Sequence, residues 1–302
     1  MPEKIIERLL ELKAEKRAII LAHNYQPPAI HAIADMMGDS LELSRLAAST
    51  DAEVIVFCGV SFMAETAAIL NPGKIVLLPR LDAGCPMADM ITPEDVVAIK
   101  AEHPGIPVVT YINSTAAVKA ESTVCCTSAN AVRVVESFGD ADAVYMAPDR
   151  NLAKYTARHT RKKVFNWNGY CPFHNGLSAE EVLRRKKEHP EALFVAHPEC
   201  SPEVLDLADE ILSTSGMLRF VRESAHEAFI IGTEIGILYP MEKQNPGKRF
   251  YPASRSMLCL DMKKTTVEDV CRSLEALAPR ITVPEDIRLK ALSSVQRMLE
   301  IS

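Results

Sequence analysis

The sequence predicts an α/β protein built from three αβα domains with parallel sheets, related by a pseudo-threefold axis. Short apolar runs alternate with amphipathic helical patterns along the chain, which is typical of buried parallel strands connected by helices. Motifs at the ends of these runs recur at an interval of about 87 residues, which is too long for a solenoid and suits three small domains.

Composition sets the first bounds on the class of protein. The chain has 302 residues, 48% of them hydrophobic, so it can bury a large core. Its 34 Lys and Arg against 40 Asp and Glu give a net charge of −6 without a basic cluster, which argues against a nucleic-acid partner. Since no apolar run reaches the length of a signal or a membrane span, we expect a cytoplasmic protein without a membrane partner.

The elements repeat in order through three predicted domains at 1–90, 91–176 and 177–262. The first domain begins with an amphipathic helix over 1–17 and has apolar strands at 18–22, 54–58 and 74–78. Its second strand, EVIVF, recurs as DAVYM and EAFII, and its third strand, KIVLL, recurs as KKVFN and KRFYP. Residues 263–302 contain two helical patterns with no counterpart, the first with a capping box from Thr265 to Glu268, and we expect both to close back on the first domain.

Polar pairs follow the first strand of each domain, in AHNYQ, TYINS and AHPEC, at intervals of 88 and 86 residues. Alternate residues of an extended segment point to one side, and loops at the carboxyl ends of parallel strands form the ligand crevice. A solvated loop explains any single pair, but together the pairs offer groups for repeated proton transfers. The pairs are His23 with Tyr25, Tyr111 with Asn113, and His197 with Glu199.

Three hydroxyl side chains, Ser40, Ser128 and Thr214, each lie 17 residues beyond these first-strand motifs. Each precedes an amphipathic segment, so ordinary N-capping is one interpretation. The other is that three helix N-termini converge on one cavity and bind a carboxylate or a phosphate. His174, in CPFHNG, either joins this polar set or simply covers the metal cluster that the neighbouring cysteine is expected to bind.

Eight cysteines in a chain of this type are more consistent with buried side chains, metal ligands or reactive thiols than with disulfides. Three of them, Cys85, Cys171 and Cys259, follow the third strands at intervals of 86 and 88 residues and are the candidate metal ligands. The chain lacks the close Cys-x-x-Cys pairs of structural zinc sites. An iron–sulfur cluster held by three cysteines leaves one iron open to substrate as a Lewis acid. The remaining cysteines are Cys58 and Cys271, expected to be buried, and Cys125, Cys126 and Cys200, which rank second as ligands.

The segments AHNYQ, GDSLELSRLA, GCPMADM, TYINSTAAVKAESTVCCTSANA, NGYCPFH, AHPEC, STSGM and IGTEIGILY together resemble the quinolinate synthases over essentially the whole chain. The resemblance implies an enzyme that condenses iminoaspartate with dihydroxyacetone phosphate into quinolinate, a precursor of the NAD ring, releasing phosphate and water. It implies three αβα domains around a 4Fe-4S cluster, and small anionic substrates supplied by an aspartate-oxidising enzyme.

Carried onto this chain, the resemblance implies that Cys85, Cys171 and Cys259 hold the cluster. It implies Tyr25, Tyr111, His197 and Glu199 as proton-transfer groups. It further implies a substrate cavity lined by His23, Ser40, Tyr111, Asn113, Ser128, His174, His197, Glu199 and Thr214. Two alternatives stay open at this point, namely a diphthamide-type radical enzyme, which must cleave a sulfonium cofactor, and a non-enzymatic iron or redox sensor.

Overall fold

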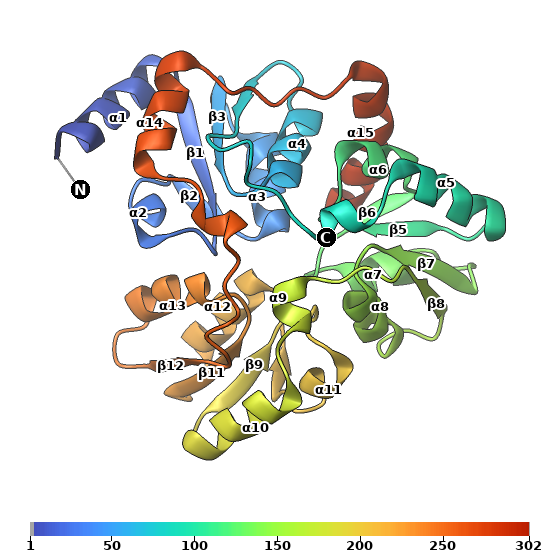
Figure 1. Cartoon of the computed structure of the whole chain (residues 1–302). Coiled ribbons are helices and arrows are strands. Elements are labelled where there is room, and N and C mark those ends of the chain that lie inside the picture. The colour runs from blue at the N-terminus through green and yellow to red at the C-terminus, as the bar shows by residue number, and fades with distance from the viewer. Residues whose placement is uncertain (1–2, 302) are drawn as a thin grey trace.

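A computed structural model describes residues 3–301, which form three parallel four-stranded sheets with helices on their faces. The three sheets belong to three lobes arranged around a common centre, and both final helices lie on the outside (Figure 1). The α/β class and the three parallel sheets predicted from the sequence are confirmed. Each sheet lies within one of the predicted domain ranges, although the boundaries themselves stay a proposal.

The first sheet has the strand order β2-β1-β3-β4. All five residues of its central strand β3 are buried, as expected for an apolar strand covered on both faces. Its elements are α1 Glu3–Glu15, β1 Ala18–His23, α2 Pro28–His31, β2 Met36–Gly38, α3 Ser40–Ser49, β3 Val54–Cys58, α4 Ser61–Leu70, β4 Ile75–Leu77 and the 3₁₀ helix η1 Ala88–Met90.

The second sheet has the equivalent order β6-β5-β7-β8. Its elements are α5 Pro93–Glu102, β5 Val108–Tyr111, α6 Ala116–Glu121, β6 Val124–Cys126, α7 Ala131–Glu136, β7 Ala143–Ala147, α8 Arg150–Ala157, β8 Lys163–Asn166 and α9 Pro172–Asn175.

The third sheet repeats the order as β10-β9-β11-β12. Its elements are α10 Ala179–Glu188, β9 Leu193–Ala196, α11 Pro202–Leu205, β10 Glu210–Ile211, α12 Thr214–Glu223, β11 Ala228–Gly232, η2 Ile235–Ile237, α13 Leu238–Gln244, β12 Arg249–Pro252 and η3 Asp261–Lys263.

Each sheet gains one short edge strand that the sequence analysis does not predict, namely β2, β6 and β10. These strands have only three, three and two residues, too few to show an alternating pattern. They matter for the site because β1 and β2 end in register, with His23 opposite Gly38. The pairing brings the polar end of β1 beside the start of α3, and the same arrangement recurs in the other two sheets.

The two final helices are α14 Val267–Ala276 and α15 Glu285–Glu300. Helix α14 packs on α1, as expected, but α15 packs mainly on α6 and β6 and also touches α4 (Figure 1). We expected both helices to close on the first domain, and α15 reaches it only at α4 while most of its packing is on the second lobe. The capping box of α14 also forms one residue later than predicted, with Thr266 and Asp269, because Thr-x-x-Asp matches the helix start there.

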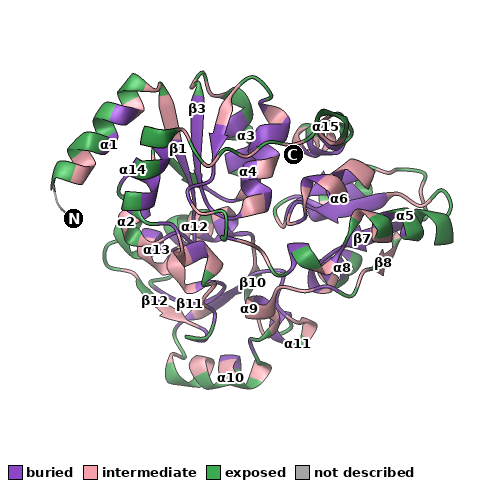
Figure 2. Ribbon diagram, turned by 45° about the horizontal axis from the view of Figure 1, so that its top comes forward, coloured by how far each residue is buried: buried purple, intermediate pink, exposed green. Residues whose placement is uncertain are grey.

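The core of the molecule crosses the domain boundaries. One apolar cluster joins Leu21 of β1, Val109 of β5 and Phe229 of β11, so the inner faces of all three lobes share a continuous interior. Figure 2 shows buried strands at the middle of the lobes and exposed residues along outer helices such as α1 and α10. Within residues 3–301, no helix combines the length and the apolar character that crossing a membrane requires.

Candidate active site

A single cavity receives side chains from all three lobes at the carboxyl ends of their sheets. Every side chain selected from the sequence as a site residue lies on its wall. These are His23, Tyr25, Ser40, Cys85, Tyr111, Asn113, Ser128, Cys171, His174, His197, Glu199, Thr214 and Cys259. Residues up to 236 positions apart in the chain are therefore brought to one place, although their roles remain proposals.

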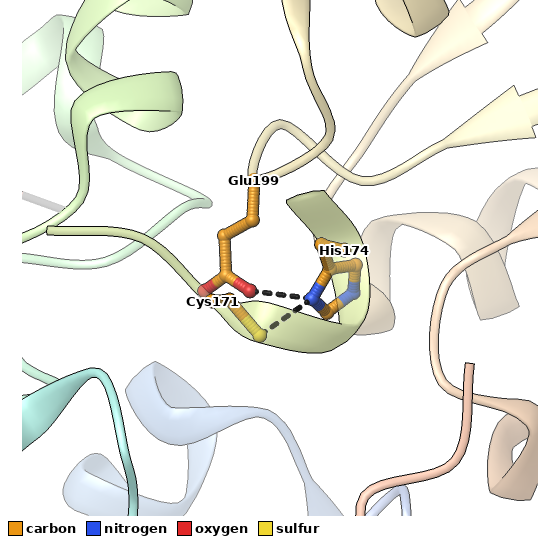
Figure 3. Close-up of side chains that lie close together, drawn as sticks. All are labelled: Cys171, His174 and Glu199. Atoms are coloured by element: carbon orange, nitrogen blue, oxygen red, sulfur yellow. Dashed lines mark hydrogen bonds and ion pairs between the residues drawn. The ribbon is translucent and has the colours of Figure 1, made fainter. Parts of the chain in front are cut away.

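Glu199 is a charged group of the cavity wall with only 3% of its surface exposed. Its Oε2 lies 2.7 Å from Nδ1 of His174 and 3.7 Å from Nδ1 of His197. The same Nδ1 of His174 lies 3.1 Å from the Cys171 sulfur, so His174 stands between a carboxylate and a thiol (Figure 3). Among the described residues, Cys171, His174 and Glu199 are the one set whose possible metal-ligating atoms all lie within 4.8 Å of one another.

The surroundings of Glu199 favour its ionised form. Burial alone raises the pKa of the carboxyl group, but His174, His197 and a hydrogen bond from Tyr111 outweigh this effect and lower the pKa to about 2. Burial lowers the pKa of His197 to about 3 and that of His23 to about 3, so both imidazoles are neutral near pH 7. The cavity wall therefore places the ionised carboxylate of Glu199 together with the neutral imidazoles of His23 and His197.

The phenol groups of Tyr25 and Tyr111 are both held in hydrogen bonds at the cavity wall. The Tyr25 hydroxyl lies 2.5 Å from Oγ1 of Thr233, and the Tyr111 hydroxyl contacts Glu199 and Ser128. Burial, followed by the charge of Glu199, raises the pKa of each phenol well above its usual value. Both phenols are therefore hydrogen-bond donors at neutral pH rather than phenolates.

The hydroxyl residues reach the cavity wall, but Ser40 and Thr214 do not cap their helices. They are the first residues of α3 and α12, and the caps are the preceding Asp39 and Ser213. The interpretation of these hydroxyls as N-caps is therefore wrong by one residue, because the preceding side chain reaches the N–H groups first. Ser128 lies ahead of the N-cap position of α7, and its Oγ is 3.2 Å from Nε2 of His197.

This capping limits what the helix N-termini offer to an anion. The Asp39 carboxylate accepts the N–H groups of Leu41 and Glu42, each at 3.0 Å, and Ser213 accepts that of Gly216 at 3.2 Å. Those N–H groups are already occupied, so the hydroxyls next to them are the groups presented to the cavity.

The three candidate cysteines are only partly buried, and each comes from a different lobe. Burial raises the pKa of Cys85 to about 12, that of Cys259 to about 11, and that of Cys171 well above its usual value. Deprotonation of all three would therefore need a cationic partner in the cavity. Ligands of one zinc ion lie about 3.8 Å apart for a tetrahedral site. Because Cys85 and Cys259 do not join Cys171 in a compact set within the described residues, the donors fit a larger multinuclear group better than a single ion.

Carboxylates hold the backbone of the three cysteine loops by accepting hydrogen bonds from it. The amide of Cys171 donates to Asp149 at 3.1 Å, and that of Cys259 donates to Glu234 at 3.2 Å. The amide of Gly84, directly before Cys85, donates to Asp261 at 3.3 Å. These hydrogen bonds set the path of each loop independently of any metal.

The sequence analysis missed several residues that support the site, chiefly Asp39, Asp149, Thr233, Glu234 and Lys263. Two of these follow β11 directly, in the segment IIGTEIG, and Asp149 follows the equivalent strand β7 in MAPDRN. Asp149 and Glu234 each stand two residues after the second strand of their domain, but the first domain has Val60 at that place, so no common residue type marks the position.

The other cysteines lie away from the cavity wall, as far as residues 3–301 are described. Cys58 is in β3 and Cys271 is on the inner face of α14, as expected for buried small side chains. The remaining Cys125, Cys126 and Cys200 are buried, and Cys200 contacts the backbone oxygen of Gly232.

Comparison with known proteins gives a consistent result. Residues 7–300 match the family model described as Quinolinate synthetase A protein. The chain is 53% identical over 299 residues to the quinolinate synthase of Geotalea uraniireducens, covering 99% of this chain and 98% of that protein. It is 54% identical over 299 residues to that of Desulforudis audaxviator, covering 99% of each, and 54% identical over 295 residues to that of Methanoregula boonei, covering 98% and 97%.

Proposed function

Because this chain belongs to the quinolinate synthase family of enzymes, we propose that it condenses iminoaspartate with dihydroxyacetone phosphate to give quinolinate, phosphate and water. The observation that supports this most strongly is the convergence of polar side chains and three cysteines from three lobes on one cavity. Both substrates are small anions, and a cavity of this composition suits their repeated proton transfers.

We propose that Cys85, Cys171 and Cys259 hold a 4Fe-4S cluster in this cavity. The donor set supports this, since it has one thiol from each lobe and no fourth cysteine on the described wall. Such a cluster supplies one iron without a protein thiolate, which acts as a Lewis acid toward an oxygen or nitrogen of the substrate.

In this proposal the polar wall binds and orients the anionic substrates. The hydroxyls of Ser40, Ser128 and Thr214 donate to carboxylate or phosphate oxygens. The side-chain oxygen of Asn113 is buried without a protein partner among the described residues, so it is placed to accept a substrate N–H or O–H. No Lys or Arg is among the described residues of the wall, so these neutral groups carry the recognition together with His23.

Proton transfer is assigned to Glu199, Tyr25, Tyr111 and His197. Glu199 is ionised, and its carboxylate, which accepts a hydrogen bond from Tyr111, is placed to accept a proton from the substrate. Neutral His197 can accept a proton at the nitrogen facing Ser128, or donate one when the tautomer is reversed. Together these groups serve the two dehydrations that close an aromatic ring.

The proposed reaction also bears on the enzyme that supplies iminoaspartate and on the compartment in which the protein works. Iminoaspartate is an imine that water hydrolyses, so we propose that an aspartate-oxidising enzyme supplies it. The eight cysteines of the chain are all free thiols, which is typical of a reducing compartment, and we place the enzyme in the cytoplasm on that basis.

The direct test is anaerobic reconstitution of the protein with iron and sulfide, followed by incubation with dihydroxyacetone phosphate and freshly generated iminoaspartate. We expect quinolinate to appear by chromatography with its ultraviolet spectrum, and Cys259→Ser to abolish it. A fully reconstituted protein that forms no quinolinate would contradict the proposal. Cleavage of a sulfonium cofactor by the same preparation would favour the radical-enzyme alternative.

A further inference from the structure

Asp39 and Ser213 join the first lobe to the third at the starts of two helices. Asp39 is the N-cap of α3, Ser213 is the N-cap of α12, and both side chains are buried. One carboxylate oxygen of Asp39, Oδ1, accepts the first N–H groups of α3, while the other, Oδ2, lies 3.2 Å from Oγ of Ser213. The Ser213 oxygen accepts the N–H of Gly216, so its own hydrogen is directed to Asp39. A single carboxylate therefore serves its own helix and the cap of a helix in another lobe.

Capping of α3 alone does not require an acid at position 39. Serine and asparagine are equally good N-caps. Burial raises the pKa of Asp39, so keeping its charge here costs free energy that an uncharged cap would avoid. The equivalent positions in the other two lobes carry Thr127 and Ser213, which are neutral. The acid is therefore better explained by its second contact, the one with Ser213.

Further hydrogen bonds cross the same boundary between the first and third lobes. The hydroxyl oxygen of Ser215 accepts the amide of Asp39 at 3.2 Å, and its hydrogen is donated to Glu42. Nδ2 of Asn24 lies 3.2 Å from Oγ1 of Thr214. Because an amide nitrogen can only donate, the hydrogen of the Thr214 hydroxyl is left available to the cavity.

We propose that Asp39 and Ser213 are positioning residues, and that the hydrogen bond between them fixes the spacing of two wall hydroxyls that belong to different lobes. These hydroxyls are Ser40 and Thr214, which directly follow the pair in the chain and lie on the cavity wall. This rests on the proposed function, in which both hydroxyls bind the anionic substrates. A substrate that contacts two lobes is held well only where its donors stand at a fixed separation.

Asp39 acts on the substrate through its neighbours in this proposal. It also borders the cavity, but both of its oxygens are engaged, Oδ1 by the start of α3 and Oδ2 by Ser213. Its negative charge would moreover repel a carboxylate or a phosphate that came into contact with it.

A reciprocal exchange separates the hydrogen bond between the lobes from helix capping. Asp39→Ser keeps an N-cap on α3, but the shorter side chain does not reach the third lobe. Ser213→Asp keeps an N-cap on α12 and places two carboxylates face to face. The double variant Asp39→Ser/Ser213→Asp keeps both caps and rebuilds one hydroxyl–carboxylate pair, with the acid now in the third lobe.

The first experiment measures thermal unfolding of the iron-free full-length wild type, both single variants and the double variant, and does not depend on catalysis. We expect each single variant to melt about 2–4 °C below the wild type, and the double variant to melt above both. Losses that simply add in the double variant would overturn the proposal, whether or not the protein makes quinolinate.

The control is Ser178→Asp, the same change at the N-cap of α10. This helix belongs to the third lobe and has ten residues, like α12, but its N-cap is exposed. The effect of Ser178→Asp should simply add to that of Asp39→Ser, because no carboxylate pair is exchanged between lobes.

The second experiment separates positioning from stability through steady-state kinetics of the reconstituted variants. We expect the KM for dihydroxyacetone phosphate to rise about tenfold in Asp39→Ser, the scale of one lost hydrogen bond to a charged group, with kcat close to that of the wild type. The double variant should recover most of this loss, and Ser178→Asp should keep the KM of the wild type. An unchanged KM in Asp39→Ser, or a raised KM that the double variant retains, would overturn the proposal. If Asp39→Ser does not fold, a folded double variant supports the proposal and an unfolded one contradicts it.

Discussion

Lys263 links two parts of the site that come from different lobes. Its ammonium group lies 2.9 Å from the carboxylate of Glu234 and also donates to the backbone oxygen of Tyr25. Glu234 in turn accepts the amide of Cys259 at 3.2 Å, so one ion pair holds both the third cysteine loop and the Tyr25 segment. Gly236 leaves the space for it, since a Cβ there would lie 2.5 Å from the oxygen of Tyr25.

The ion pair predicts the effect of Lys263→Met. Glu234 is 1% exposed, and loss of its partner leaves a buried carboxylate uncompensated, a change that costs on the order of 3 kcal/mol. We expect a lower free energy of unfolding in urea and a lower iron content after reconstitution. The control is Lys290→Met, because Lys290 is 65% exposed and pairs with Glu121 at 3.5 Å on the surface. Equal stability and iron content in the two variants would refute the linking role.

Glu199 carries the proposed proton transfer, and Glu199→Gln tests it with little change in size. In the wild type, Nδ1 of His174 lies 2.7 Å from Oε2 of Glu199. The side-chain oxygen of glutamine can still accept this hydrogen bond, but the amide cannot take up a proton. We expect turnover to fall about a hundredfold or more, with the cluster spectrum and KM close to those of the wild type. Near-normal turnover with an intact cluster would contradict this role for Glu199 and would assign the proton transfer to Tyr25 or His197.

At the scale of elements, the sequence predicted the strands and loops whose motifs recur in all three domains. The first-strand motifs recur at fixed intervals, so His23, Tyr111 and His197 could be recognised as equivalent positions, and the structure places all three on one cavity wall. The loops after the second strands carry Val60, Asp149 and Glu234 at comparable places, and three different residue types give no such signal.

The edge strands and the packing of α15 could not be predicted because they depend on contacts with segments that are distant in the sequence. The edge strands β2, β6 and β10 are too short for periodicity, and their presence depends on a neighbouring strand that supplies the hydrogen bonds. The hydrophobic pattern of α15 predicts that one face of the helix is buried. It does not predict which element that face packs against. Its docking on α6 and β6 depends on the surface that the second lobe offers after it has folded.

Helix α15 predicts a stability effect far from the cavity. Met298 is fully buried in the shared core, and Ser294 on the same helix donates to the backbone oxygen of Lys119 at 2.8 Å. We expect Met298→Ala to lower the free energy of unfolding by about 2–5 kcal/mol, because it removes a buried side chain and leaves a cavity. Gln296→Ala, at an exposed position of α15, should change it by about 0.5 kcal/mol or less. Urea unfolding of both variants makes the comparison, and similar values would contradict the packing described for α15.

At the scale of the whole molecule, the lobes are joined in two independent ways. The apolar core crosses all three lobes, and hydrogen bonds such as that from the amide of Ala116 of α6 to Glu65 of α4, at 2.9 Å, connect the first lobe to the second. The cysteines would add a third connection, since one group bound to Cys85, Cys171 and Cys259 touches every lobe. The core makes the iron-free chain able to fold, and the cluster would then stabilise a state that already exists.

This arrangement predicts that cluster loading raises the melting temperature of the whole chain. A group that binds only the folded state stabilises it by mass action, by about 2.7 kcal/mol when present at a hundred times its dissociation constant. Calorimetry of the reconstituted and iron-free proteins, both anaerobic, should therefore show a higher melting temperature with the cluster. Cys85→Ser, Cys171→Ser and Cys259→Ser should each remove the difference, because the remaining two thiols connect only two lobes. Cys271→Ser, in α14 and away from the cavity, should keep it. A melting temperature that does not depend on iron, or full iron content in Cys259→Ser, would contradict the shared cluster and direct attention to Cys200 or the Cys125–Cys126 pair.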